Sequence, residues 1–369
     1  MSSNRVFYAV HGIGFKQDGV EGRIPTGGEA HGVQSIGVNT SFNLEQLFEL
    51  GQNEIYENYE NKPDIELTVE KILDDTPLVY HLATAGSSGP ALTARTTKRC
   101  IGIIPIYPDT YESASGVPDT IMTCSGLYVS SLAYDFPVDG QATETVTLIG
   151  SDKVWATSSS GFEYSFDNAD SPGSDGAQRR EDFIMGETAD CTLLPTELPG
   201  ITASGTNPLN AGGTAYEAHV QSISTSVDLG REDLFELGRR GEYHKFVNFP
   251  VGVTTTIGMT ATSAGDEIDA RSEGTNVSDQ TIRLSTKDNT QIYLGTKNKL
   301  QSVSYTGGDA TGGNVTVSYT YIGYNTFTVT NPTNDPIDEQ GFGPALFFWC
   351  ELPQAKASGL SFENWCNIN

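Results

Sequence analysis

The sequence lacks several features that would define its class at once. No stretch approaches the ~20 consecutive apolar residues that a membrane-spanning helix needs. The first residues do not combine a charged segment with an apolar one, as a signal peptide does. Glycine-rich phosphate-binding motifs, the zinc-protease motif and the serine-hydrolase motif are also missing. We therefore expect neither a membrane protein nor a common nucleotide-binding or hydrolytic enzyme, and we expect assembly in the cytoplasm.

Cysteine is scarce and its spacing is uninformative. The 5 cysteines form no CxxC pair, and the 5 histidines are scattered. This pattern argues against a zinc site and favours free thiols in a reducing compartment, with a bond between subunits as the alternative. Residues 167–176 have the carboxylates and glycines of a calcium loop but the wrong spacing. We expect no metal and no cofactor.

Basic residues are few. The chain has 21 lysines and arginines against 47 acidic residues, a formal net charge of −26. Such a surface repels phosphates and argues against a conventional nucleic-acid-binding protein. The acidic residues either keep the protein soluble or allow DNA to pass along it without being bound. In so acidic a chain, neighbouring carboxylates say little about acid–base catalysis.

What the sequence does contain is an internal repeat. LFELG occurs at residues 47–51 and 234–238, and VQSI at residues 33–36 and 220–223, with the same offset. That offset also relates two tyrosines, Tyr56 and Tyr243, and two prolines. Agreement in one register indicates a duplication. The residues that define the repeat are Leu47, Phe48, Gly51 and Pro63 in the first copy, and Leu234, Phe235, Gly238 and Pro250 in the second.

The composition predicts a mainly β protein. Forty glycines, 17 prolines and 37% hydrophobic residues are typical of a turn-rich chain. We expect two tandem β-sandwich or barrel domains, each with a short flanking helix, at residues 1–157 and 214–331. Residues 158–213 would connect them, and residues 332–369 would form a C-terminal extension. Strands are expected at residues 5–15 and 32–42, and hairpins at residues 127–150 and 300–323.

The flanking helix is expected around the repeated LFELG. Leu44, Leu47, Phe48 and Leu50 have helical spacing, and Asn43 can cap the helix start. Gly51 would end the helix in a left-handed conformation. Gly238 would do the same in the second copy. A second short helix is expected within residues 76–83.

After Pro63 the sequence alternates as in a half-buried strand. Ile65, Leu67 and Val69 would face the core, and the opposite face would carry acidic and polar residues. In the second copy the alternation is shifted, so one inserted residue or a bulge must intervene. The residues expected on the open faces are Asp64, Glu66, Thr68 and Glu70 in the first copy, and Thr254 and Thr256 in the second.

The C-terminal extension concentrates aromatic residues. An isolated tail of this composition would be sticky, so it must pack on its own chain or on a neighbouring subunit. The candidate inter-subunit residues are Phe347, Phe348, Trp349, Phe362 and Trp365.

At residues 31–73, 77–84 and 229–256 the sequence resembles tail tube proteins of tailed bacteriophages. The resemblance implies a small β-sandwich or barrel with a flanking helix. Six such domains close into a ring, and stacked rings form the conduit for genomic DNA. It also implies a structural virion protein, not an enzyme, that resides in the tail. Its partners would be copies of itself and other tail proteins, such as the sheath, baseplate or terminator. Double-stranded DNA would pass through the lumen without specific binding, and no membrane would be contacted.

A chain with two units departs from this family pattern. Three chains could provide six units in a pseudo-sixfold ring, or six chains could place one unit each in the wall. We favour three, because both copies keep the same elements. The six open-face residues named above are then the candidates to line the lumen, where carboxylates would repel DNA phosphates. The alternatives are another phage structural protein, such as a neck or capsid decoration protein, and an acidic carbohydrate-active enzyme.

Overall fold

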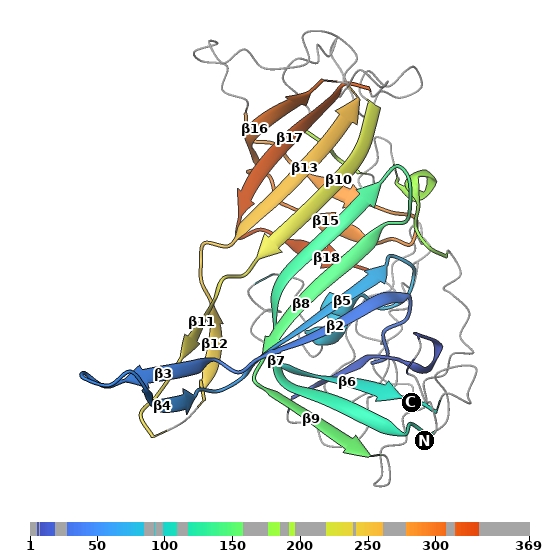
Figure 1. The fold of residues 1–369 in the computed structure, drawn as a ribbon. Coiled ribbons are helices and arrows are strands. Elements are labelled where there is room, and N and C mark those ends of the chain that lie inside the picture. The colour runs from blue at the N-terminus through green and yellow to red at the C-terminus, as the bar shows by residue number, and fades with distance from the viewer. Residues whose placement is uncertain are drawn as a thin grey trace, which may run out of the picture.

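The structure is a computed structural model (Figure 1). It describes residues 6, 8–18, 28–84, 92, 99–108, 117–157, 176–184, 192–195, 219–238, 241–260, 278–307 and 314–331. The described part is mainly β, as the composition predicts, and all named strand pairs are antiparallel.

The elements follow one another in two series. The first series is η1 (Tyr8–Val10), β1 (Gly14–Gln17), β2 (Val33–Ser41), β3 (Leu44–Phe48), β4 (Ile55–Glu60), β5 (Asp64–Ile72), α1 (Val79–Ala83), β6 (Cys100–Ile106), β7 (Thr120–Pro137), β8 (Thr143–Gly150) and β9 (Asp152–Thr157). The second series is η2 (Arg180–Asp182), β10 (His219–Asp228), β11 (Arg231–Leu234), β12 (His244–Val247), β13 (Gly252–Thr260), β14 (Arg283–Ser285), β15 (Gln291–Tyr293), β16 (Lys299–Thr306), β17 (Thr316–Tyr324) and β18 (Thr328–Thr330).

One 11-stranded sheet contains strands from both series. Its main path has the order β16-β17-β13-β10-β7-β8-β5-β2, and β1, β6 and β9 extend it beside β7. The long strand β7 joins both parts, because its first half pairs with β6 and β9 and its second half with β8 and β10. Figure 1 shows the eight strands of the main path side by side.

The sheet contains the same four-stranded arrangement twice. The first unit is β7-β8-β5-β2, and the second unit is β16-β17-β13-β10, so strands equivalent in chain order occupy equivalent places. The bulges agree as well: one lies at Gln34 in β2 and at Gln221 in β10. Another lies at Ser130 in β7 and at Gln301 in β16. Because a bulge pins the register of a strand pair, these agreements identify equivalent positions in the two units.

The inserted residue expected in the second copy is present. Ile65 of β5 lies opposite Gly150, and Val253 of β13 lies opposite the equivalent Gly323. One extra residue therefore separates Pro250 from its strand. The hairpins expected at residues 127–150 and 300–323 are also found, as β7–β8 and β16–β17. The strand expected at residues 5–15 is found only at its end, since Tyr8–Val10 forms a 3-10 turn.

The two units share one hydrophobic core on one face of the sheet. Its members come from both units, from α1 and from the small sheet β14-β15-β18. The ring of Phe327, just before β18, contacts the rings of Tyr80 in α1 and Tyr134 in β7. His81 Nε2 lies 3.0 Å from the carbonyl oxygen of Val329. The first series is therefore packed directly against the second. The boundaries of the expected domains stay a prediction, because residues 158–175 and 332–369 lie outside the described residues.

The prediction of a helix around the repeated LFELG is wrong. Leu44–Phe48 forms strand β3 of a hairpin with β4, and the equivalent segment forms β11, paired with β12. The apolar residues have helical spacing, but every residue of β3 and β4 is exposed, so no core face stabilises a helix here. Gly51 and Gly238 have positive φ as expected (96° and 86°), but in or beside turns between strands. The helix expected within residues 76–83 is present as α1.

A buried carboxylate fastens α1 to the sheet. Glu144 of β8 is fully buried and accepts hydrogen bonds from the Tyr134 hydroxyl (2.7 Å) and from the Val79 and Tyr80 amides (2.7 and 3.3 Å). Burial raises the pKa of Glu144, and these donors together with Lys71 oppose the rise. The equivalent residue of the second unit is Val317, which lies opposite Tyr305 as Glu144 lies opposite Tyr134.

Replacing Glu144 by valine, the residue of the second unit, is expected to destabilise the protein. Three donors around a buried site would lose their acceptor, which costs about 3–5 kcal/mol in total. Glu144→Gln keeps an acceptor oxygen and is expected to cost about 1–2 kcal/mol. Urea unfolding of both variants measures the difference. Equal losses for valine and glutamine would show that the acceptor is not what stabilises this contact.

Candidate assembly surfaces

The face of the large sheet opposite the core is open. In β5, Ile65, Leu67 and Val69 are buried, whereas Asp64 and Glu66 are exposed and Thr68 and Glu70 are half-buried on the other face. In β13, Thr254 and Thr256 are half-buried on the open face, between buried neighbours. The alternation expected from the sequence is therefore observed in both units.

The open face is lined by short hydroxyl side chains. Residues that lie opposite each other in an antiparallel pair point to the same face, so the register identifies its members. Apart from the six predicted residues, its serines and threonines in the described strands are Ser35 and Ser41 (β2), Ser131 (β7), Thr143, Thr145 and Thr147 (β8), Ser222, Ser224 and Ser226 (β10), Thr260 (β13), Ser302, Ser304 and Thr306 (β16), and Thr316, Ser318 and Thr320 (β17).

Acidic residues dominate the charge of this face. Asp135 of β7 and Asp228 of β10 join the three predicted carboxylates, and in the described strands only Lys299 and His219 oppose them. Burial, and then the negative charge of Glu70, raise the pKa of Asp135. Glu70 belongs to β5 and Asp135 to β7, so the negative charge of this face extends across several strands and is not confined to β5.

The outer strands β2 and β16 each have one free edge. Each pairs with only one neighbour in the described part of the chain, which leaves a row of backbone donors and acceptors unpaired. In the interior of the sheet, the equivalent strands β10 and β7 pair with each other. The β7–β10 contact is therefore a junction between the two units within one chain. The equivalents of its two strands, β16 and β2, lie at the two ends of the sheet, where each could form the same contact with another chain.

Side chains at the free edges are more exposed than their equivalents at the β7–β10 junction. Tyr305 of β16 is 44% exposed, whereas the equivalent Tyr134 of β7 is 0% exposed. Val303 is half-buried where Leu132 is buried, and Ile36 of β2 is half-buried where Ile223 is buried. The free edges thus show core-facing side chains that lack a covering strand.

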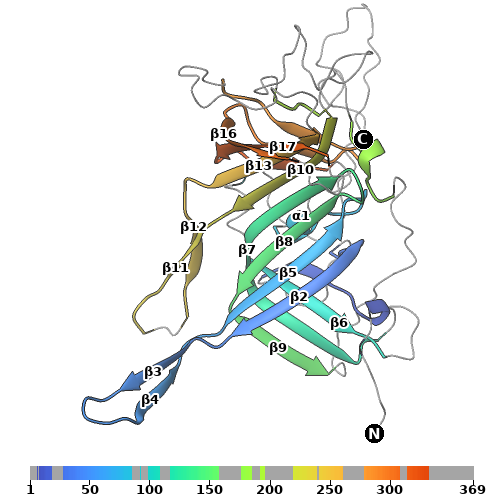
Figure 2. The same cartoon turned by 45° about the horizontal axis from the view of Figure 1, so that its top comes forward.

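Two hairpins extend from one end of the sheet. The β3–β4 hairpin connects β2 to β5, and the β11–β12 hairpin connects β10 to β13 at the equivalent place. Both extend from the same end of these strands (Figures 1 and 2). Their exposed large apolar residues are Leu44, Leu47, Phe48, Leu50, Ile55, Tyr56 and Tyr59 in the first, and Phe235, Leu237, Tyr243 and Phe246 in the second.

The second hairpin is attached to the first unit at its base. The Arg231 guanidinium donates to the carbonyl oxygen of Val129 (2.5 Å) and lies over the Tyr128 ring, 4.9 Å from its centroid. The Tyr128 hydroxyl lies 3.0 Å from His244 Nδ1, and burial lowers the pKa of Arg231 to about 10. Lys62, beside the first hairpin, forms an ion pair with Glu242 (2.9 Å).

The described residues show neither a cluster of metal ligands nor an exposed thiol. They include no group of three or more histidine, cysteine, aspartate or glutamate residues that could hold a metal ion. Cys100 and Cys124 are buried free thiols, and burial raises the pKa of both, that of Cys124 to about 11. None of the helices in the described part has the length and apolar composition needed to cross a bilayer.

Some predicted residues are not tested, and some surfaces were not predicted. Phe347, Phe348, Trp349, Phe362 and Trp365 lie outside the described residues. The repeat-defining residues Phe48 and Phe235 lie on the hairpins, exposed to solvent. Sequence reasoning did not identify which strands carry the free edges, although the matching hairpins expected at residues 127–150 and 300–323 could have pointed to β16 as the counterpart of the internal strand β7.

Comparison with known proteins leaves the family open. No protein-family model and no curated protein matches the chain. A chain in the solved structure "Cryo-EM structure of the anti-feeding prophage (AFP) baseplate, 6-fold symmetrised" is 14% identical, with a TM-score of 0.29. The match covers 42% of this chain and 99% of that chain. An identity and a TM-score this low assign neither a family nor a function.

Proposed function

We propose that this protein is a structural component of a phage tail and forms its tube. Copies join edge to edge through the large sheet, closing into rings that stack into a conduit for DNA. The observation that supports this most directly is the β7–β10 junction, which joins two equivalent four-stranded units, while the equivalent strands β2 and β16 have free edges at the two ends of the described sheet.

Ring closure would repeat the internal junction between chains. Strand β16 of one chain would pair antiparallel with β2 of the next, as β7 pairs with β10. Thr225 lies opposite Tyr134 at the internal junction, and Val227 lies opposite Leu132. The bulge-defined equivalences then put Val38 opposite Tyr305, and Thr40 opposite Val303, across the interface. The exposed Tyr305 ring would become buried, as Tyr134 is.

Three chains per ring are the preferred arrangement. Both units of a chain lie in one continuous sheet, so they present their open faces to the same side. Three chains would then provide six units related by a pseudo-sixfold axis. This contact is heterologous, and it closes when its rotation returns to the first chain. A ring of six chains with one unit each in the wall would leave the second unit outside a sheet to which it is hydrogen-bonded.

The open face would line the lumen. Its hydroxyl groups are short and its charge is mainly negative, so a DNA duplex would be repelled from all sides and meet few cations to bind. The protein would act as a passive conduit in the virion tail, without enzymatic activity or a cofactor. It would contact other tail proteins, such as a sheath, baseplate or terminator, at the ends or outside of the tube.

Electron microscopy of the purified protein, combined with its mass in solution, tests the proposal. The expected particles are hollow rings and stacked tubes, with three chains per ring by native mass spectrometry. Rings of six chains would correct the stoichiometry. Featureless particles at all concentrations would contradict the tube function and favour another virion part, and hydrolysis of a polysaccharide would favour an enzyme.

A further inference from the structure

The tips of the two hairpins carry the longest of the repeated segments named above. Both carry Leu-Phe-Glu-Leu-Gly, at residues 47–51 and 234–238. The side chains of Phe48 and Phe235 are 66% and 64% exposed, and Leu50 and Leu237 are fully exposed. Large apolar side chains kept at an exposed tip in both copies indicate a binding element and not a packing element.

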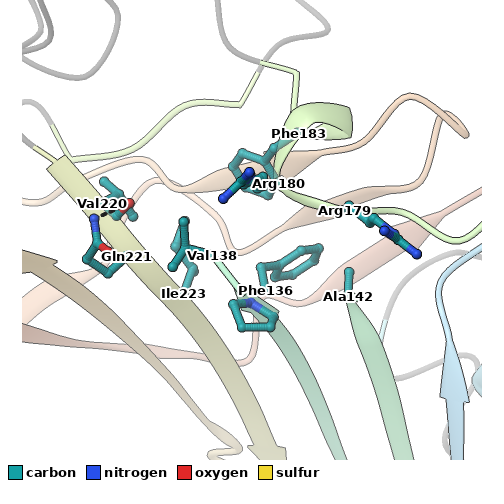
Figure 3. A pocket seen from close by; sticks show the side chains of 10 residues that line it. Phe136, Val138, Ala142, Arg179, Arg180, Phe183, Val220, Gln221 and Ile223 are labelled. Atoms are coloured by element: carbon teal, nitrogen blue, oxygen red, sulfur yellow. Dashed lines mark hydrogen bonds between the residues drawn. The ribbon is translucent and has the colours of Figure 1, made fainter. Parts of the chain in front are cut away.

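An apolar cavity lies at the opposite end of the sheet. It has a volume of about 100 Å³ and is lined by the end of β7, the start of β10 and residues around η2 (Figure 3). Phe136 and Phe183 meet edge to face across it, with ring centroids 5.3 Å apart. Strand β10 begins at the cavity and ends at the base of the second hairpin. Its ten residues separate the two by ~30 Å.

The border of the cavity carries two arginines, and the tip carries a glutamate. Arg179 and Arg180 are exposed and lie at this border, beside Phe136, Phe183 and Ala142 (Figure 3). Arg180 also lies 4.0 Å from Asp139 and 3.9 Å from Glu181, in exposed ion pairs that are weak enough to be exchanged for a new carboxylate partner. At the tip, Glu49 stands between the two exposed apolar residues Phe48 and Leu50. An apolar side chain could fill the cavity while the glutamate pairs with an arginine at its border.

We propose that the tip of the β3–β4 hairpin docks in this cavity of a second copy, in the next ring of the stack. The inference rests on the proposed function, because it names the contact between rings. Tip and cavity lie at opposite ends of the strands, so every copy offers one to the ring on one side and the other to the ring on the other side. Such a contact does not close on itself and extends indefinitely along an axis.

The first hairpin fits this role better than the second. Arg231 and His244 hold the base of the second hairpin against the first unit, whereas every residue of β3 and β4 is exposed. The equivalent place in the second unit lacks the aromatic side chain, because Gly307 stands where Phe136 would be.

A charge exchange tests the contact. The variants are Glu49→Arg, Arg179→Glu with Arg180→Glu, and the combination of all three. Glu236→Arg makes the same change at the tip of the second hairpin and serves as the control. The measurement is the protein concentration at which rings stack into tubes, determined by sedimentation and electron microscopy, with the thermal unfolding midpoint confirming that each variant is folded.

Each charge reversal alone is expected to raise that concentration at least about 30-fold while leaving rings intact. The combined variant is expected to return to within about threefold of the original value, and Glu236→Arg to stay there. Stacking by Glu49→Arg at the original concentration, or no recovery in the combined variant, would overturn the inference. The latter is the result expected if the aromatic C-terminal segment of the same chain occupies the cavity. Absence of rings in the unaltered protein would count against the tube itself and, with it, against this contact.

Discussion

Replacing Tyr305 by aspartate is expected to leave the protein as a folded monomer that forms no rings. The Tyr305 side chain lies at the free edge of β16 and is 44% exposed, so the change should cost the isolated chain little. At the proposed junction the same side chain would be buried like Tyr134, which is 0% exposed. An unpaired carboxylate there would be desolvated, at a cost of several kcal/mol per junction. Analytical ultracentrifugation and electron microscopy measure the loss.

The neighbouring Ser304 provides the matched control. It lies on the same strand but points to the open face, opposite Ser318. In the proposed ring, Ser304→Asp adds one more acid to a surface that already carries Glu66 and Glu70, so rings are expected to form. If Ser304→Asp and Tyr305→Asp abolish rings equally, the burial of Tyr305 is not what closes the junction. If neither does, β16 is not an interface.

Replacing Glu66 and Glu70 by lysine is expected to convert a conduit that does not bind DNA into one that does. Both residues lie on the open face, and both exchanges replace a repelling charge by one that displaces counterions from phosphates. Six such lysines in a ring of three chains would bind duplex DNA with an affinity that falls on the order of 10³-fold between about 50 and about 200 mM salt. Fluorescence anisotropy of a labelled duplex with purified rings measures the effect.

The control makes the same charge change away from the open face. Glu54 and Glu57 lie in the first hairpin and are exposed. Rings that carry Glu54→Lys and Glu57→Lys have the same net charge as the lumen variant but are expected to bind the duplex much more weakly. Equal binding by both variants would show that the net charge of the protein, and not the position of the acidic residues, determines its affinity for DNA.

Strand alternation and the duplication were sufficient to predict much of the open face. Ile65, Leu67 and Val69 alternate with polar residues in β5, and burial in the structure follows the same period. Periodicity could be interpreted correctly here because one face of β5 packs on a core. The shifted phase in the second copy likewise predicted the extra residue before β13, which the register confirms.

The hairpins could not be predicted by the same argument. Leu44, Leu47 and Phe48 have helical spacing, but they face solvent in the single chain, so their apolar character reflects no intramolecular packing. A hydrophobic pattern reports which residues are buried somewhere, in the chain or in an assembly, and it predicts a secondary structure only if the packing partner is known. The sequence could not assign the free edges to β2 and β16 for a related reason, because the place of a strand in the sheet depends on strands far away in the sequence.

The β7–β10 junction also has a kinetic meaning. Because a covalent connection holds its two strands at a high effective concentration, every second junction of a pseudo-sixfold ring would form during folding, at any dilution. Joining three chains into a ring would then cost translational and rotational entropy twice, whereas joining six separate units would cost it five times. A duplicated chain can therefore start a ring at lower abundance than single units with equally weak edges.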